Sequence, residues 1–242
     1  SFHLNALENI SAIDQWYHMN KSSNYEEFME ALNIMGIPRF NIMYADKEDN
    51  IYYVSNAQLP VRDTSYDWEG LLPGNTSKTC IGEYHKLADL PQLLNPSQGY
   101  LFNTNNSPFK CAHNLDSPKE EDYSATFSFR EKINNRSLRF EELIEGYDKI
   151  SYQDFMDIKY DQQYPTPIFC PFEINDVFEY NSVDYPEIKD LIDIIQSWDK
   201  KADTKNLGAG QWYMYYKYLN NNIVKVQHDI ESAVPDSLII DA

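Results

Sequence analysis

Two short apolar runs joined by a charged turn place the strongest constraint on how this chain can fold. Residues 40–45 (FNIMYA) and 51–56 (IYYVSN) are rich in aromatic and β-branched side chains, and the polar stretch DKEDN separates them. This pattern predicts an antiparallel hairpin. Alternation along the first strand points Asn41 and Met43 to one face and Ile42 to the other. Because both faces are largely apolar, we expect strands that are covered by layers on both sides.

The rest of the chain separates into a loop-rich part and a helical part. Asn24 followed by Glu27 is typical of a helix start, and it predicts a helix over residues 24–36. Residues 63–120 are punctuated by Pro, Gly, Asn and Asp, which favours long ordered loops. Further helices are expected over residues 5–20, 124–146, 151–160, 184–203 and 208–221, with Trp212, Tyr213, Tyr216 and Leu219 as core residues of the last. We therefore predict a mixed portion over residues 1–120 and a mainly helical portion over 121–242.

Composition excludes several classes of protein. The chain has 242 residues, a formal charge of −18 and 42% hydrophobic residues, which indicates a folded and strongly acidic protein. Such a charge repels phosphate backbones, so nucleic acid is not an expected partner. No run approaches the roughly 20 apolar residues of a membrane span, and the first ten residues do not read as a signal peptide.

The sequence also offers no clear metal or cofactor site. The three cysteines, Cys80, Cys111 and Cys170, have no CxxC spacing, and the five histidines show no paired metal spacing. Buried thiols are the simpler interpretation. The stretch DKEDNI lacks the glycine and the distal glutamate of a calcium-binding EF-hand loop, so we interpret Asp46 as a turn residue.

Several short motifs, in one order, resemble the penicillin acylase (penicillin amidase) family. The hairpin stretch and the residues after it fit the family pattern N-x-x-Y-A-D-x-x-G-N-I-x-Y and then P-x-R. The stretches YDWEGLLPG and LPQLLNPSQGYLFNTNNSPF fit the next two motifs. The likeness is detailed from about residue 10 to residue 109 and general in the helical half. Asp49 replaces the family's glycine in the turn, and aspartate tolerates the left-handed conformation better than most residues do.

The resemblance implies a fold and a mechanism. Members of the family are N-terminal-nucleophile hydrolases with an αββα sandwich fold. Each is made as a precursor polypeptide that is cleaved into an α chain and a β chain. We therefore expect an α+β fold, in which an antiparallel hairpin with long loops forms part of that sandwich and a mainly helical subdomain comes after it. A serine at the start of the β chain attacks an amide carbonyl, with its own α-amine as the base.

Asn41 and Arg62 are the candidate catalytic residues. Asn41 matches an asparagine whose side-chain amide donates a hydrogen bond to the oxyanion, and Arg62 matches an arginine that organises the active site. The alternative interpretation is that Asn41 is an ordinary turn residue and Arg62 a surface cation. No cofactor is implied.

Ser1 is not the expected nucleophile. Only 39 residues separate it from Asn41, and a helix is predicted between them, which leaves no space for the strands that come after the family's serine. We expect the chain to be an internal piece of a longer β chain, inactive alone, whose partners are the rest of that chain and the α chain. The apolar surface that such a piece exposes could also support a homo-oligomer.

The resemblance also implies a class of substrate and a location. The substrate would be a small acyl amide, such as a penicillin or an acyl-homoserine lactone, and the enzyme would be periplasmic or extracellular. A different class of function remains open: 19 Tyr and 4 Trp could form a noncatalytic module that binds carbohydrate or another ligand.

Overall fold

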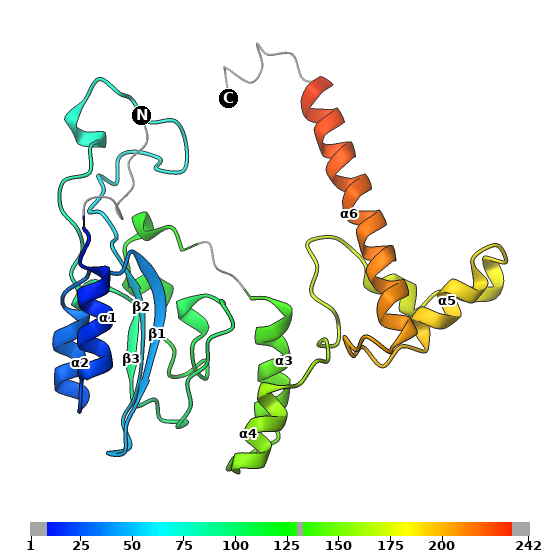
Figure 1. Ribbon diagram of the computed structural model, residues 1–242. Helices are drawn as coiled ribbons and strands as arrows, with labels where there is room; N and C mark the ends of the chain where they lie inside the picture. Colours follow the sequence, from blue (N-terminus) through cyan, green and yellow to red (C-terminus); the bar gives the residue numbers. More distant parts are fainter. Residues whose placement is uncertain (1–8, 130–132, 234–242) are drawn as a thin grey trace. The chain divides into compact units, whose positions relative to one another are not determined.

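The structure is a computed structural model that describes residues 9–129 and 133–233 (Figure 1). The chain folds into two compact units, residues 1–133 and residues 134–242. The first unit contains a small sheet with two helices and long loops, and the second is helical. Ser1 lies outside the described residues.

The predicted hairpin is confirmed. Strand β1 (Arg39–Ala45) pairs antiparallel with β2 (Ile51–Ala57), and β3 (Gln92–Leu94) adds to the other side of β2. The register sets Asn41 opposite Ser55. Because β2 is the central strand, its residues are buried on both faces from Tyr52 onward.

Helices α1 (Ala12–Lys21) and α2 (Tyr25–Leu32) cover one face of the sheet (Figure 1). Phe28 and Leu32 of α2 pack with Ile42 and Val54 of the sheet in one buried cluster. Asn24 begins α2 as predicted, since its side-chain oxygen accepts a hydrogen bond from the N–H of Glu27 at 2.8 Å. The buried apolar contacts then hold the helix on the sheet.

Helix α2 ends at Leu32, four residues earlier than predicted. Met35 adopts a left-handed conformation with φ of 51°, which breaks the helical path before Gly36. Gly36 then approaches the start of α1 so closely that an added Cβ would lie 2.3 Å from the carbonyl carbon of Ser11. A close approach of two backbones therefore requires the glycine here.

Buried amide side chains join α1 to the sheet. Gln15 is fully buried, and its oxygen accepts a hydrogen bond from the N–H of Ile37 at 2.7 Å. Asn56, also fully buried, donates to the carbonyl of Ile37 at 2.9 Å and accepts from Gln15 at 3.4 Å. The two buried amides and the backbone of Ile37 thus supply hydrogen-bond partners for one another, which offsets the cost of burying these polar groups.

The two strands of the hairpin differ in how well they are covered. On the face away from the helices, Tyr53 and Ser55 of β2 are buried, and burial raises the pKa of Tyr53, near which Cys111 lies. The edge strand β1 exposes 55% of Phe40 and 44% of Met43. The expectation of layers on both sides thus holds for β2, whereas β1 leaves apolar side chains exposed within the described part of the chain.

The predicted loop region contains short 3-10 turns and no long helix in its described residues. Three turns of the first unit begin at a capping side chain, as at Ser107, whose hydroxyl accepts a hydrogen bond from the N–H of Phe109. Among the described residues of this unit, the 3-10 turns are Ser77–Thr79, Leu87–Asp89, Pro108–Lys110, Glu120–Asp122 and Ala125–Phe127.

Four helices form most of the second unit: α3 (Asn135–Ile144), α4 (Tyr152–Lys159), α5 (Lys189–Gln196) and α6 (Leu207–Ala233). Trp198 and Trp212 pack with Ile195 in its core, and their rings lie 5.3 Å apart. Of the predicted core residues of α6, Trp212, Tyr216 and Leu219 belong to this cluster, but Tyr213 is 54% exposed.

The helix expected over residues 124–146 begins later than predicted, at Asn135. Asn134 accepts hydrogen bonds from the N–H groups of Arg136 and Ser137 and so begins α3. This cap fixes the start of the helix, because it supplies partners for N–H groups that the helix itself leaves unsatisfied. Within the described ranges, no helix combines the length and apolarity of a membrane span.

Candidate active site

The hairpin turn is organised by one carboxylate. Asp46 accepts hydrogen bonds from the N–H groups of Glu48 at 2.9 Å and Asn50 at 3.0 Å, and from the hydroxyl of Tyr44 at 2.8 Å. Its bond with the Asn50 side chain, above all, holds the pKa of Asp46 below its ordinary value. Asp49 takes the left-handed conformation with φ of 65°, in agreement with the predicted tolerance.

These bonds account for the position of the Asp46 carboxylate in the turn. Its partners are all hydrogen-bond donors from neighbouring residues. No group of three or more His, Cys, Asp or Glu side chains suited to a metal occurs among the described residues. The hydrogen bonds of its carboxylate support the interpretation of Asp46 as a turn residue. The turn fixes the register that brings Asn41 opposite Ser55.

Asn41 lies near the start of β1, on the sheet face that α1 and α2 do not cover. It shares this face with Met43, and it is neither fully buried nor exposed. Its side-chain nitrogen donates a hydrogen bond to the side-chain oxygen of Asn103 at 3.1 Å. An amide nitrogen carries two N–H donors. Among the described residues, the Asn41 side chain uses one of them, in its hydrogen bond to Asn103.

Asn103 belongs to a loop held together by asparagine side chains. Its oxygen also accepts from the N–H of Asn105 at 2.9 Å, and Asn105 has a positive φ of 61°. Asn106 is only 2% exposed, accepts from the N–H of Thr104 at 2.7 Å and donates to the carbonyl of Lys110 at 2.7 Å. The loop therefore presents a fixed oxygen to Asn41.

Arg62 is anchored by two contacts in the same unit. Its Nη1 donates to the carbonyl of Thr126 at 3.0 Å, and the guanidinium lies 5.3 Å from the centre of the Trp68 ring. Burial lowers the pKa of Arg62, and its Nε is buried with no hydrogen-bond partner among the described residues. The guanidinium remains protonated at neutral pH, so a partly buried positive charge is fixed here.

The two predicted residues have different contact partners. Asn41 is two residues into β1, and Arg62 comes after the end of β2 at Ala57, opposite the turn. The described contacts of Asn41 and Arg62 share no residue. Their partners were not predicted from the sequence, although Asn103 and Trp68 lie within the family motifs.

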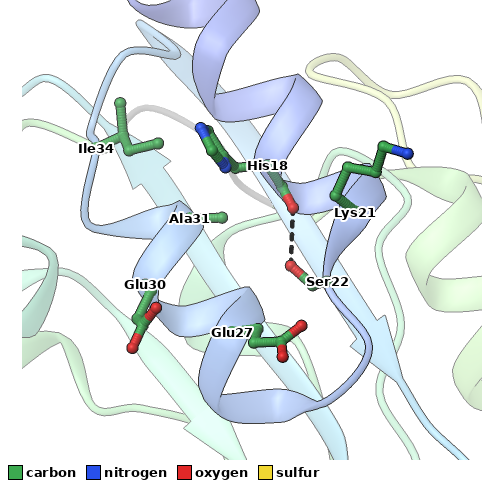
Figure 2. A pocket seen from close by; sticks show the side chains of 7 residues that line it. All are labelled: His18, Lys21, Ser22, Glu27, Glu30, Ala31 and Ile34. Atoms are coloured by element: carbon green, nitrogen blue, oxygen red, sulfur yellow. Dashed lines mark hydrogen bonds between the residues drawn. The ribbon is translucent and has the colours of Figure 1, made fainter.

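A shallow depression of about 380 Å³ lies elsewhere, between α1 and α2 (Figure 2). It carries both signs of charge, because α1 contributes His18 and Lys21 whereas α2 contributes Glu27 and Glu30. Its remaining wall is formed by Ser22, Ala31 and Ile34. Neither Asn41 nor Arg62 lines it, and it belongs to the helical layer on the opposite face of the sheet from Asn41.

Comparisons with known proteins agree on one family. A sequence model described as penicillin amidase matches residues 1–239. Penicillin G acylase of Escherichia coli is 28% identical over 113 residues, which cover 42% of this chain and 12% of that protein. The structure of a thermostable penicillin G acylase from Alcaligenes faecalis superposes with a TM-score of 0.57 at 21% identity, covering 83% of this chain and 34% of that one. The mixed helix and sheet fold therefore resembles that of a penicillin acylase, and the chain spans a minor part of either relative.

Proposed function

Because this chain belongs to the penicillin amidase family, we propose that it forms part of an enzyme that hydrolyses small acyl amides. The observation that carries the proposal is the side-chain amide of Asn41. A strand holds it, Asn103 uses one of its donors, and the described contacts leave its second N–H for a ligand. Such a fixed donor suits a carbonyl oxygen that gains negative charge during the reaction.

The proposed nucleophile is an N-terminal serine of a longer polypeptide in which this chain is an internal piece. The serine hydroxyl attacks the amide carbonyl, and the α-amine of the same residue accepts its proton. An unperturbed α-amine has a pKa of about 7.7–8.0, so it acts as a base near neutral pH without a histidine. The αββα sandwich expected for the family would bring this serine to the sheet that carries Asn41.

Asn41 would then stabilise the tetrahedral intermediate. Its N–H donates to the oxyanion as the carbonyl oxygen becomes negative, and the donor costs no reorganisation because β1 and Asn103 already hold it. Removing one such donor typically costs about 2.7–4 kcal/mol of transition-state stabilisation.

Arg62 would organise the site through its charge. Its fixed guanidinium has a buried Nε that lacks a partner among the described residues, and it therefore has a donor available to an acceptor from the rest of the enzyme. Thr126 and Trp68 hold the group in place, which is what an organising residue requires.

The same proposal implies the partners. The rest of the β chain and the α chain would cover apolar side chains that this chain exposes, such as Phe40 and Met43 on the edge strand. A homo-oligomer is the other way to cover them. We propose, in addition, that the enzyme is periplasmic or extracellular. The family match also favours this hydrolase over a noncatalytic carbohydrate-binding module.

The test is an assay of the full-length protein on a panel of acylated amines. Phenylacetyl, phenoxyacetyl and longer aliphatic acyl groups, each on the same chromogenic amine, separate acyl preference from leaving-group effects. We expect release of the amine with a covalent acyl-enzyme intermediate on the N-terminal serine, detectable by mass spectrometry. Hydrolysis that persists after this serine is replaced, or carbohydrate binding with no hydrolysis of any acyl amide, would contradict the proposal.

A further inference from the structure

We propose that Asn103 is a positioning residue that fixes the orientation of the Asn41 amide. The inference rests on the proposed function of Asn41 and extends it to a residue 62 positions later in the chain. The side-chain oxygen of Asn103 accepts a hydrogen bond from the side-chain nitrogen of Asn41 at 3.1 Å. Asn103 itself touches no reacting atom in this proposal, so its effect passes through Asn41.

The chemistry of an amide explains why an acceptor is needed. The two ends of the Asn41 side chain have nearly the same shape, but one donates and the other accepts hydrogen bonds. A half-turn of the amide would present a carbonyl oxygen to the substrate and would repel a developing oxyanion. The Asn103 oxygen favours the orientation in which nitrogen faces it, so the second N–H of Asn41 keeps its direction.

The loop gives this acceptor a fixed place. The same Asn103 oxygen accepts from the N–H of Asn105 at 2.9 Å, which holds the side chain against its own backbone. The buried Asn106 then binds the N–H of Thr104 and the carbonyl of Lys110, one on each side of it. Two independent sets of hydrogen bonds therefore support the oxygen that Asn41 contacts.

Two roles for Asn103 are possible, and one substitution separates them. In Asn103→Ser, the hydroxyl can still accept from the N–H of Asn105, because serine forms the same kind of turn less strongly. The serine side chain is shorter than that of asparagine, so its hydroxyl oxygen does not reach the side-chain nitrogen of Asn41. The variant thus retains the turn and loses the contact with Asn41. Asn103→Thr repeats the test with a second hydroxyl side chain.

The experiment is a double-mutant cycle in the full-length enzyme. The kcat and KM for one acyl amide are measured for the wild type, Asn41→Ala, Asn103→Ser and the double variant, with Asn114→Ser as a control on an exposed asparagine of the same region. We expect Asn103→Ser to lower kcat about 10- to 100-fold with KM little changed, as a misplaced catalytic group does. In the Asn41→Ala background it should change kcat less than about twofold.

Each outcome decides a separate question. If Asn41→Ala alone leaves kcat unchanged, the proposed function of Asn41 fails. If Asn41→Ala lowers kcat but Asn103→Ser lowers it equally in both backgrounds, Asn103 has a structural role and only the positioning inference fails. An unchanged kcat in Asn103→Ser overturns the inference as well, and so does a failure of both the serine and the threonine variants to fold, since that shows a structural need.

Discussion

Replacing Asn106 with alanine should loosen the loop that carries Asn103, and the structure allows the size of the effect to be worked out. The side chain is 2% exposed, and its oxygen accepts from the N–H of Thr104 at 2.7 Å and from the Thr104 hydroxyl at 2.9 Å. Its nitrogen donates to the carbonyl of Lys110 at 2.7 Å and to that of Ser107 at 3.3 Å. Alanine supplies none of these bonds.

The magnitude depends on the groups left behind. A buried polar group that loses its partner costs about 1–3 kcal/mol, and the two short bonds to the backbone of Thr104 and Lys110 are the main losses. Because both residues are partly exposed, water can replace some of each bond. We therefore expect the free energy of opening this loop to fall by about 2–3 kcal/mol.

Hydrogen–deuterium exchange of the full-length protein measures this directly. A fall of about 2–3 kcal/mol corresponds to exchange that is about 30- to 150-fold faster in peptides covering residues 102–112. Asn114→Ala is the matched control, because this exposed asparagine accepts from the Lys110 ammonium at 2.9 Å and should change the exchange little. Unchanged exchange over residues 102–112 in Asn106→Ala would refute the idea that Asn106 holds the loop.

Three further predictions concern the hairpin and its surroundings. Gly36→Ala places a Cβ 2.3 Å from the backbone at the start of α1, and in urea titrations it should lower the free energy of unfolding by about 1–3 kcal/mol. Gly74 has open space around it, so Gly74→Ala should leave the free energy of unfolding nearly unchanged. The pKa of Asp46 is lowered in the folded state, so its carboxylate stabilises the fold at pH values above the ordinary pKa of 3.8, and this contribution is lost as the pH falls through the folded pKa. The free energy of unfolding of Asp46→Asn should therefore decrease less on acidification than that of the wild type. Trp68→Ala removes the ring that contacts Arg62 and should lower kcat about 2- to 5-fold, whereas Trp68→Phe should retain most of the wild-type kcat. Equal kcat values for the two variants would show that the contact between the ring and Arg62 does not contribute to catalysis.

Local features of the first unit were predictable because short-range chemistry determines them. The apolar runs of β1 and β2 and the polar turn between them define a hairpin, and neighbouring residues supply the bonds of the Asp46 carboxylate. The start of α2 at Asn24 is equally local, since the cap bonds a residue three positions away. The family motifs added Asn41 and Arg62 as candidates, whose catalytic roles stay predictions.

The features that were missed depend on contacts between distant residues. The hydrogen bond from Asn41 to Asn103 joins residues that are 62 positions apart. It depends on the path of the loop that carries Asn103, and the spacing of residues in the sequence does not predict that path. The early end of α2 goes with the left-handed conformation of Met35 and with the close approach of Gly36 to the backbone of Ser11, which is 25 positions earlier in the chain. Tyr213 fits the apolar pattern of α6 but lies outside the packed stripe, because helical periodicity alone does not say which face finds a partner.

The central claim is that the Asn41 amide stabilises an oxyanion, and the kcat of Asn41→Ala in the full-length enzyme tests it most directly. Asn33→Ala serves as the control, because this exposed asparagine caps α2 and lies away from the sheet face of Asn41. We expect Asn41→Ala to lower kcat about 100- to 1,000-fold with a small change in KM, and Asn33→Ala to leave kcat unchanged. A kcat for Asn41→Ala within about threefold of the wild type would contradict the claim.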